Sequence, residues 1–166
     1  MTKKILVVDD ESSIREALSK VLHAEDYEVV SAENGQEAVE MFAAEKIDLL
    51  LLDLGLPVKD GWETLAWLAG VNPLLPVIII TGRHAQRELA QAAGADALVE
   101  KPLNVPSLLE TIRELTDEPL ERRAERASQR TSGFRYISCD SELFRELRHK
   151  QFTTPYVDPE MKCSRS

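Results

Sequence analysis

Five polar side chains stand at the ends of four short apolar runs in this sequence. Asp9 and Asp10 follow the first of these runs, Asp53 follows another, Thr81 ends a third and Lys101 comes after a fourth. If the runs are parallel strands of one sheet, their carboxyl ends meet at the edge where such sheets bind ligands. Carboxylates that are held close together repel each other, which raises their pKa values or recruits a cation. The set therefore predicts a site for a hard divalent ion such as Mg²⁺, which takes one or two carboxylates, several waters and a phosphate.

The same residue types suit phosphoryl transfer. Asp53 is the candidate nucleophile, because a carboxylate can attack phosphorus without a base to deprotonate it. Asp9 and Asp10 are candidate Mg²⁺ ligands, and Lys101 and Thr81 are candidate contacts to the phosphoryl oxygens. Taken singly, each residue has an ordinary explanation as a solvated turn, a helix cap or a strand threonine. The functional interpretation gains weight because the residues fall at the same end of four different strands.

Residues 4–117 alternate short apolar runs with longer segments at helical spacing, which is typical of β-α units around a parallel sheet. We predict an α/β, doubly wound parallel sheet of five strands with five flanking helices. The second predicted strand is the most polar and so the expected edge, whereas the first, third and fourth are expected to be buried on both faces. The predicted strands are Lys4–Val8, Tyr27–Ala32, Asp48–Leu52, Pro76–Thr81 and Ala97–Glu100.

Capping residues indicate where several of the helices begin and end. Ser12 or Ser13 is the expected N-cap of the first helix, and Asn34 opens a capping-box pattern ahead of the second. Asn104 is expected to cap the fifth helix. Gly94 is expected to end the fourth helix in a left-handed conformation.

Composition and charge narrow the class of protein. The chain has 166 residues, 43% of them hydrophobic, and no apolar run approaches the roughly 18 residues that a membrane helix needs. Its N-terminus lacks the apolar core of a secretory signal, so we expect a cytoplasmic protein. Residues 1–118 carry 10 Lys and Arg against 22 Asp and Glu, a net charge of −12. An acidic domain of this kind disfavours direct DNA binding, which depends on a basic surface.

Residues 119–166 are expected to form a C-terminal extension to this domain, partly helical or disordered. They carry 10 Lys and Arg against 7 Asp and Glu, a net charge of +3. A helix after Pro119 would be marginal in isolation, because like charges recur four residues apart. Residues 141–150 are a second candidate helix. The extension has no recognisable output domain, and its two cysteines form neither a disulfide framework nor a metal pattern.

Residues 1–118 resemble the receiver domain of two-component response regulators. The motifs that carry this resemblance are Ile5-Leu-Val-Val-Asp-Asp-Glu11, Asp53-Leu-Gly-Leu-Pro57, Asp60-Gly61, Val77-Ile-Ile-Ile-Thr-Gly82, Gly94-Ala95 and Lys101-Pro102. The resemblance implies a flavodoxin-like strand order 2-1-3-4-5 and transfer of a phosphoryl group from a phosphohistidine to Asp53. It implies that Asp10, Asp53 and the backbone carbonyl of Gly55 bind Mg²⁺, with Asp9 acting partly through water. It also implies a cis peptide bond between Lys101 and Pro102.

One departure from the family pattern concerns how the signal would be read out. The family usually places an aromatic switch residue on the fifth strand, coupled to the hydroxyl of Thr81, and the matching residue here is Leu98. The expected partners are a sensor histidine kinase or a histidine phosphotransfer protein, and an unidentified downstream protein reached through protein contacts. The pattern leaves open whether the protein is a monomer or a homodimer. It describes a phosphoacceptor that assists its own phosphorylation and dephosphorylation, rather than a turnover enzyme.

Two alternative functions stay open at this point. The first is a DNA-binding transcriptional regulator acting through the basic extension, which is short for a winged-helix domain and shows no helix-turn-helix pattern. The second is an aspartate-nucleophile phosphatase resembling the haloacid dehalogenases. That family would want a second aspartate two residues after the nucleophile, where this sequence has Gly55.

Overall fold

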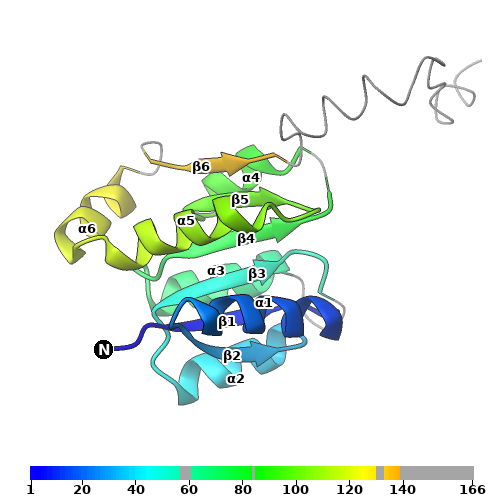
Figure 1. Cartoon of the computed structure of the whole chain (residues 1–166). Helices are drawn as coiled ribbons and strands as arrows, with labels where there is room; N and C mark the ends of the chain where they lie inside the picture. Colours follow the sequence, from blue (N-terminus) through cyan, green and yellow to red (C-terminus); the bar gives the residue numbers. More distant parts are fainter. Residues whose placement is uncertain (57–60, 84, 130–132, 139–166) are drawn as a thin grey trace, which may run out of the picture.

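A parallel sheet of six strands forms the centre of the protein, one strand more than the sequence predicts. The computed structural model describes residues 1–56, 61–83, 85–129 and 133–138. Within them the strands lie side by side in the order β2-β1-β3-β4-β5-β6, and every neighbouring pair is parallel (Figure 1). The predicted order 2-1-3-4-5 of the first five strands is confirmed. The strands are β1 (Lys4–Val8), β2 (Glu28–Ala32), β3 (Leu49–Asp53), β4 (Val77–Thr81), β5 (Ala97–Glu100) and β6 (Arg135–Ile137).

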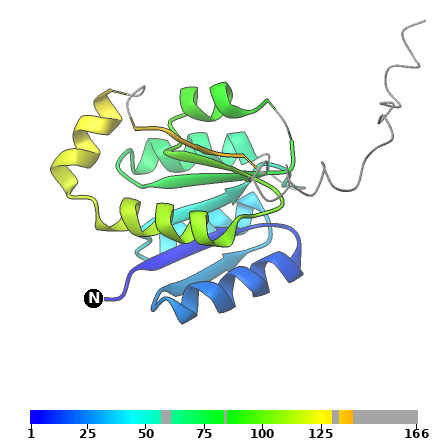
Figure 2. The same cartoon turned by 45° about the horizontal axis from the view of Figure 1, so that its top comes forward.

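Helices cover both faces of the sheet, as a doubly wound fold requires (Figures 1 and 2). On one face lie α1 (Ser12–Ala24) and α5 (Val105–Asp117), whose buried leucines and isoleucine join one apolar cluster with the strands. On the other face α2 (Gly35–Ala44), α3 (Gly61–Val71) and α4 (Arg87–Ala92) pack into a second cluster. Among the described residues, no helix is long and apolar enough to cross a membrane.

Burial along the strands follows the expected pattern. Every residue of β3 and β4 is buried, because these strands lie inside the sheet with helices on both faces. Strand β2 stands at the edge and exposes two of its five residues, as its polar sequence predicts. Asp48 was predicted inside the third strand but lies just before it, where its carboxylate accepts the Lys4 N–H at 2.8 Å. Asp53 is the last residue of β3.

The helix ends agree with the capping predictions except at α1. Asn34 accepts the N–H of Glu37 at 2.9 Å and Asn104 accepts the N–H of Ser107 at 3.1 Å, so both caps are confirmed. Gly94 follows α4 with a positive φ of 89°, the left-handed conformation that glycine adopts without a steric cost. The prediction of a serine N-cap for α1 was wrong, because α1 begins at Ser12 and Glu11 occupies the N-cap position.

The first described part of the extension is a helix, α6 (Leu120–Ser128). Repulsion between its like charges would make this helix marginally stable in isolation, and contacts with the rest of the protein stabilise it. Arg123 donates to the carbonyls of Leu115 and Thr116 at 3.2 and 3.1 Å, which satisfies acceptors at the C-terminal end of α5. Arg126 pairs with Glu118 at 2.6 Å and also with Asp96.

The second described part is β6, which the sequence analysis missed. It pairs with β5 over three residues, from Arg135 opposite Ala97 to Ile137 opposite Val99. A run of three residues is too short to show the periodicity of a strand, so the sequence gives no sign of β6. The segment is a strand because it pairs with the edge of β5. The segment 141–150, predicted as a second helix, lies outside the described residues.

Candidate metal site at the carboxyl ends of the strands

The predicted acidic residues meet at one edge of the sheet. Asp9 and Asp10 come directly after β1, and Asp53 ends β3, which is the neighbour of β1. The structure brings one carboxylate oxygen from each of these three residues within 4.8 Å of the other two. Adjacent parallel strands that both end in acidic residues therefore produce the cluster, as the strand pattern predicts.

Two of the three carboxylates are buried. Asp9 is 1% exposed and Asp53 is 7% exposed, whereas Asp10 is exposed to solvent. Each buried carboxylate has one oxygen bound to a backbone N–H: Asp9 Oδ1 accepts from Glu11 at 2.9 Å and Asp53 Oδ1 from Gly55 at 3.0 Å. These hydrogen bonds hold both side chains in place and leave Oδ2 of each for a cation.

Lys101 is the cation that faces both buried carboxylates. Its Nζ lies 3.2 Å from Asp9 Oδ2 and 3.2 Å from Asp53 Oδ2. The peptide bond between Lys101 and Pro102 is cis, and the Lys101 N–H donates to the Thr81 carbonyl at 2.8 Å. The Lys101 ammonium thus connects the ends of β1 and β3, neither of which is adjacent to β5 in the sheet. Its single positive charge offsets only part of the charge of the three carboxylates.

The protonation of this cluster reflects burial and mutual charge. Burial raises the pKa of Asp9 above its ordinary value and is the largest effect; the hydrogen bond from the Glu11 N–H opposes the rise, the charge of Asp53 adds to it, and Lys101 lowers it. Burial lowers the pKa of Lys101, but the charges of Asp53 and Asp9 and the hydrogen bonds to them together outweigh burial, so the pKa is raised overall. Lys101 is therefore protonated at neutral pH, while the ionised form of Asp9 is held at a cost.

The remaining predicted site residues lie around this cluster. Thr81 ends β4, is 1% exposed, and accepts the N–H of Arg83 through Oγ1 at 3.0 Å, so its hydroxyl proton is available to another acceptor. A side chain at Gly55 would begin 3.7 Å from Asp53 Oδ1, an ordinary contact distance. Leu98 is fully buried in the apolar cluster of α2, α3 and α4.

Two residues that support the site were not identified from the sequence in this role. Arg15 on α1 donates to the backbone carbonyl of Asp9 at 2.6 Å. Gly61, the first residue of α3, lies against the backbone of Asp53 and Leu54. A Cβ at Gly61 would come 2.6 Å from Leu54 Cα and 2.9 Å from the Asp53 carbonyl oxygen. The motif Asp60-Gly61 forms part of the resemblance to receiver domains but gives no sign of this close approach.

The donor set fits Mg²⁺. This ion prefers oxygen ligands, commonly takes one or two carboxylates, and keeps part of its water shell. The exposed carboxylate of Asp10 leaves the cluster open to solvent on one side, while the buried pair supplies uncompensated negative charge. The arrangement can hold a divalent cation beside an acceptor oxygen of Asp53 and can offer Lys101 to an incoming anion.

A family model described as "Response regulator receiver domain" matches residues 5–113. Among curated proteins, response regulator MprA of Mycobacterium tuberculosis is 38% identical over 117 residues, which cover 69% of this chain and 51% of that protein. Response regulator MprA of Mycobacterium avium is 37% identical over 114 residues, which cover 68% of this chain and 50% of that protein. The chain spans about half the length of the curated relatives it matches.

Solved structures of the same kind superpose on this chain. A CheY-like response regulator receiver domain protein from Methanospirillum hungatei JF-1 has a TM-score of 0.68 and 32% identity, covering 75% of this chain and 98% of its own. Response regulator protein TrrA from Thermotoga maritima, solved in complex with Mg(2+)-BeF, has a TM-score of 0.64 and 37% identity. The match with TrrA covers 69% of this chain and 99% of TrrA.

Proposed function

The chain belongs to the response regulator receiver domain family, and we propose that it is a phosphorylation-dependent switch of a two-component or phosphorelay system. A sensor histidine kinase or a histidine phosphotransfer protein would supply the phosphoryl group, and Asp53 would accept it in a Mg²⁺-dependent reaction. The observation that carries this proposal is the position of Asp53, which ends β3 with one oxygen on the Gly55 N–H and the other facing Lys101.

In the proposed reaction an oxygen of Asp53 forms a bond to phosphorus as the bond from phosphorus to the histidine nitrogen breaks. The imidazole leaves with the electron pair of that bond, so no base is needed to activate the carboxylate. The Gly55 N–H holds the other oxygen of Asp53 and so orients the attacking atom. Positioning and charge neutralisation are the main contributions to phosphoryl transfer, and the site supplies both.

Each neighbouring residue has a separate task in this proposal. Asp9, Asp10, Asp53 and the backbone carbonyl of Gly55 would hold Mg²⁺, which when bound neutralises charge on the phosphoryl oxygens. Lys101 would exchange its contact to Asp53 Oδ2 for one to a phosphoryl oxygen, because the bond to phosphorus removes the charge of the carboxylate and the phosphoryl oxygens carry negative charge. The hydroxyl of Thr81, adjoining on β4, would donate to another phosphoryl oxygen.

The output of the switch would be a contact with another protein. Receiver domains of response regulators are signalling switches that interact with histidine kinases and downstream targets, and they are not conventional enzymes. We propose residues 1–118 as the receiver domain and 119–166 as its extension, with action in the cytoplasm. Leu98 occupies the position of the usual switch aromatic, so a different residue would report the state of Thr81.

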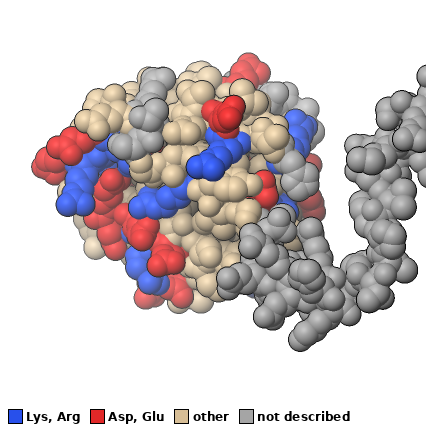
Figure 3. Space-filling view, turned by 90° about the horizontal axis from the view of Figure 1, so that it is seen from above, with Lys and Arg blue, Asp and Glu red and all other residues tan. Residues whose placement is uncertain are grey.

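The charge of the extension bears on the DNA-binding alternative. Two of its arginines, Arg123 and Arg126, contact backbone carbonyls or carboxylates of the protein itself. On the edge of the molecule that carries β6, acidic and basic side chains lie interspersed (Figure 3). A mixed surface of this kind is a weak match for the phosphates of a duplex. The phosphatase alternative is weakened by Gly55, which has no carboxylate to act as its acid or base.

Phosphorylation by acetyl phosphate in the presence of Mg²⁺ tests the assignment of Asp53. Intact-mass spectrometry should show one added phosphoryl group on the wild type and none on Asp53→Asn. Asp48→Asn is the matched control, because it removes a carboxylate at the opposite end of β3 and should label normally. Undiminished labelling of Asp53→Asn would refute the proposal.

Beryllofluoride, a phosphoryl mimic, tests the metal separately. Its binding should require Mg²⁺ and should be lost when a chelator is added, because the acidic cluster repels an anion unless a cation is present. Tight binding in the presence of the chelator would contradict the proposed ligand role of Asp9 and Asp10.

A further inference from the structure

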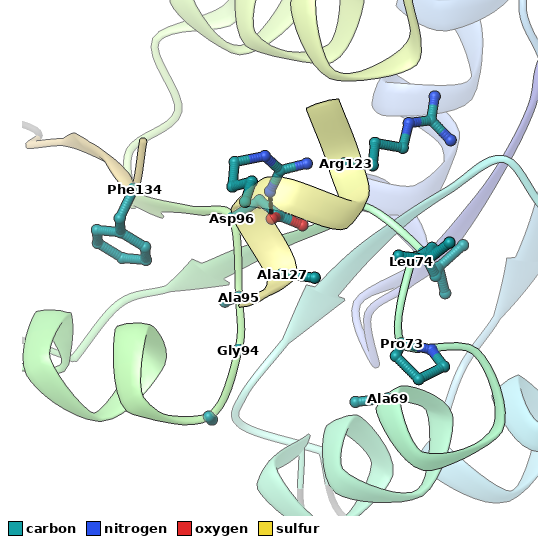
Figure 4. A pocket seen from close by; sticks show the side chains of 12 residues that line it. Ala69, Pro73, Leu74, Gly94, Ala95, Asp96, Arg123, Ala127 and Phe134 are labelled. Atoms are coloured by element: carbon teal, nitrogen blue, oxygen red, sulfur yellow. Dashed lines mark ion pairs between the residues drawn. The ribbon is translucent and has the colours of Figure 1, made fainter. Parts of the chain in front are cut away.

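The extension is attached to β5 at both ends of that strand. At the end remote from the acidic cluster, Arg126 of α6 pairs with Asp96 and Glu118, and the Asp96 carbonyl accepts the N–H of Arg135 at 3.0 Å. Figure 4 shows Asp96 beside α6, with a dashed line for its ion pair. The Arg126 and Asp96 side chains are only 15% and 12% exposed. This attachment is partly buried and contains several charged contacts, so it holds α6 firmly.

The other attachment lies at the end of β5 that carries the acidic cluster. The hydroxyl of Tyr136 donates to Glu100 Oε1 at 2.6 Å, and the guanidinium of Arg87 lies 5.3 Å from the centre of the Tyr136 ring. We call these two contacts the Tyr136 latch. Tyr136 is 39% exposed, so this attachment is more open to solvent than the one at Asp96.

Both partners of Tyr136 are tied to the candidate phosphorylation site. Glu100 is the residue before Lys101, and in the sheet it stands opposite Thr81. The Lys101 N–H donates to the Thr81 carbonyl at 2.8 Å, which links the ends of β4 and β5. Arg87 is the first residue of α4, the helix that follows β4 and Thr81. A shift of Thr81 and Lys101 would therefore displace Glu100 and Arg87, the two residues that contact Tyr136.

We propose that phosphorylation of Asp53 opens the Tyr136 latch and releases β6 from the edge of β5, while α6 stays attached. This inference rests on the function proposed above. When Lys101 and Thr81 turn to the phosphoryl group, Glu100 and α4 move relative to β6. The bond from Tyr136 to Glu100 has the short length of a charge-assisted hydrogen bond, so displacement of either residue weakens it.

Release of β6 would expose the edge of β5 in the phosphorylated state only. The edge of β5 is an extended strand whose backbone groups can pair with another segment, a common mode of peptide recognition. In this structure its occupant is the chain's own β6, paired from Arg135 to Ile137. The coupling is reciprocal: if occupancy of the Asp53 site weakens the latch, removing the latch strengthens occupancy of that site by the same factor.

Hydrogen exchange on the full chain tests the proposal, with beryllofluoride and Mg²⁺ as the probe. Binding of the probe is followed independently by ¹⁹F NMR. In the bound state the amides of residues 135–138 should exchange about fivefold faster, the lower range of typical couplings between sites, while those of α6 stay unchanged. Unchanged or slower exchange at β6 with the probe bound would overturn the proposal. Failure of the probe to bind would instead overturn the function proposed above, and this inference with it.

The reverse direction of the coupling is measured with Tyr136→Phe. This variant keeps the aromatic ring and loses the hydrogen bond to Glu100, so it should bind beryllofluoride about fivefold more tightly than the wild type. Tyr27→Phe removes a hydroxyl just before β2, which lies at the opposite edge of the sheet from β6, and should leave the affinity unchanged. Equal affinity of Tyr136→Phe and the wild type would contradict the latch.

Discussion

Helix α3 contains two glycines, Gly61 and Gly70, and the packing around them predicts opposite effects when each is replaced by alanine. A Cβ at Gly61 would lie 2.6 Å from Leu54 Cα, 2.9 Å from the Asp53 carbonyl oxygen and 3.0 Å from the Leu54 carbonyl oxygen. These neighbours are backbone atoms, so no side chain can rotate away to make room. Gly70, near the other end of α3, has no atom within 4 Å of the corresponding position. One helix thus contains both the test and its control.

The two substitutions should shift stability in opposite directions. Forcing an extra carbon into a packed interior costs about 1–3 kcal/mol, so Gly61→Ala should lower the free energy of unfolding by that amount. That loss is large beside a typical total of about 5–15 kcal/mol. Gly70→Ala should raise the free energy of unfolding by about 0.5–1 kcal/mol, because alanine loses less backbone entropy in a helix.

Urea unfolding followed by tryptophan fluorescence measures both effects. Trp62 is the residue after Gly61 and packs against the apolar cluster, so its emission reports on this helix. Because the clash falls on the backbone of Asp53 and Leu54, Gly61→Ala should also slow labelling by acetyl phosphate under conditions where the variant is folded. A Gly61→Ala protein that is as stable as the wild type and labels normally would refute the packing argument.

Three further predictions concern the charged cluster, a helix cap and the extension. Because burial raises the pKa of Asp9 above 3.8, the unfolded chain ionises first as pH rises. Metal-free wild type should therefore lose stability relative to Asp9→Asn from about pH 3.8 through the raised pKa, as denaturation in EDTA across pH will show. Asn104→Ala should lower the free energy of unfolding by about 1 kcal/mol, and Asn104→Asp, which keeps an accepting oxygen, should lie close to wild type in urea melts. Arg126→Ala leaves two mostly buried carboxylates without their cation and should cost about 3 kcal/mol or more, whereas loss of the exposed Arg122 should cost at most about 0.5 kcal/mol by the same measurement.

The sheet and its acidic edge could be predicted because local patterns determine them. Continuous apolar runs indicate buried parallel strands, and polar residues directly after those runs must then gather at one edge. This rule places Asp9, Asp10, Asp53 and Lys101 at one edge, and in the structure the three carboxylates lie together with Lys101 in contact with two of them. The caps at Asn34 and Asn104 were equally local, since each involves residues three apart.

The extension could not be predicted in the same way, because its structure depends on distant residues. The stability of α6 comes from contacts such as that of Arg126 with Asp96, thirty positions earlier in the chain, and its own charge pattern opposes a helix. Strand β6 has three residues and becomes a strand only where β5 offers an edge. The N-cap of α1 was missed because Glu11 occupies it without a side-chain hydrogen bond, which leaves no signature in the residue type.

The contacts of Asp96 with α6 and β6 set a lower limit on the length of a stable fragment of this protein. Its carboxylate accepts the Val77 N–H at 2.7 Å and pairs with Arg126, while its carbonyl accepts the Arg135 N–H at 3.0 Å. A fragment cut at residue 118, the boundary suggested by charge and composition, would keep this carboxylate and lose its cation. It would also expose the edge of β5, and unprotected edges of this kind promote pairing between copies of a chain. The minimal fragment for work in solution should therefore extend through β6.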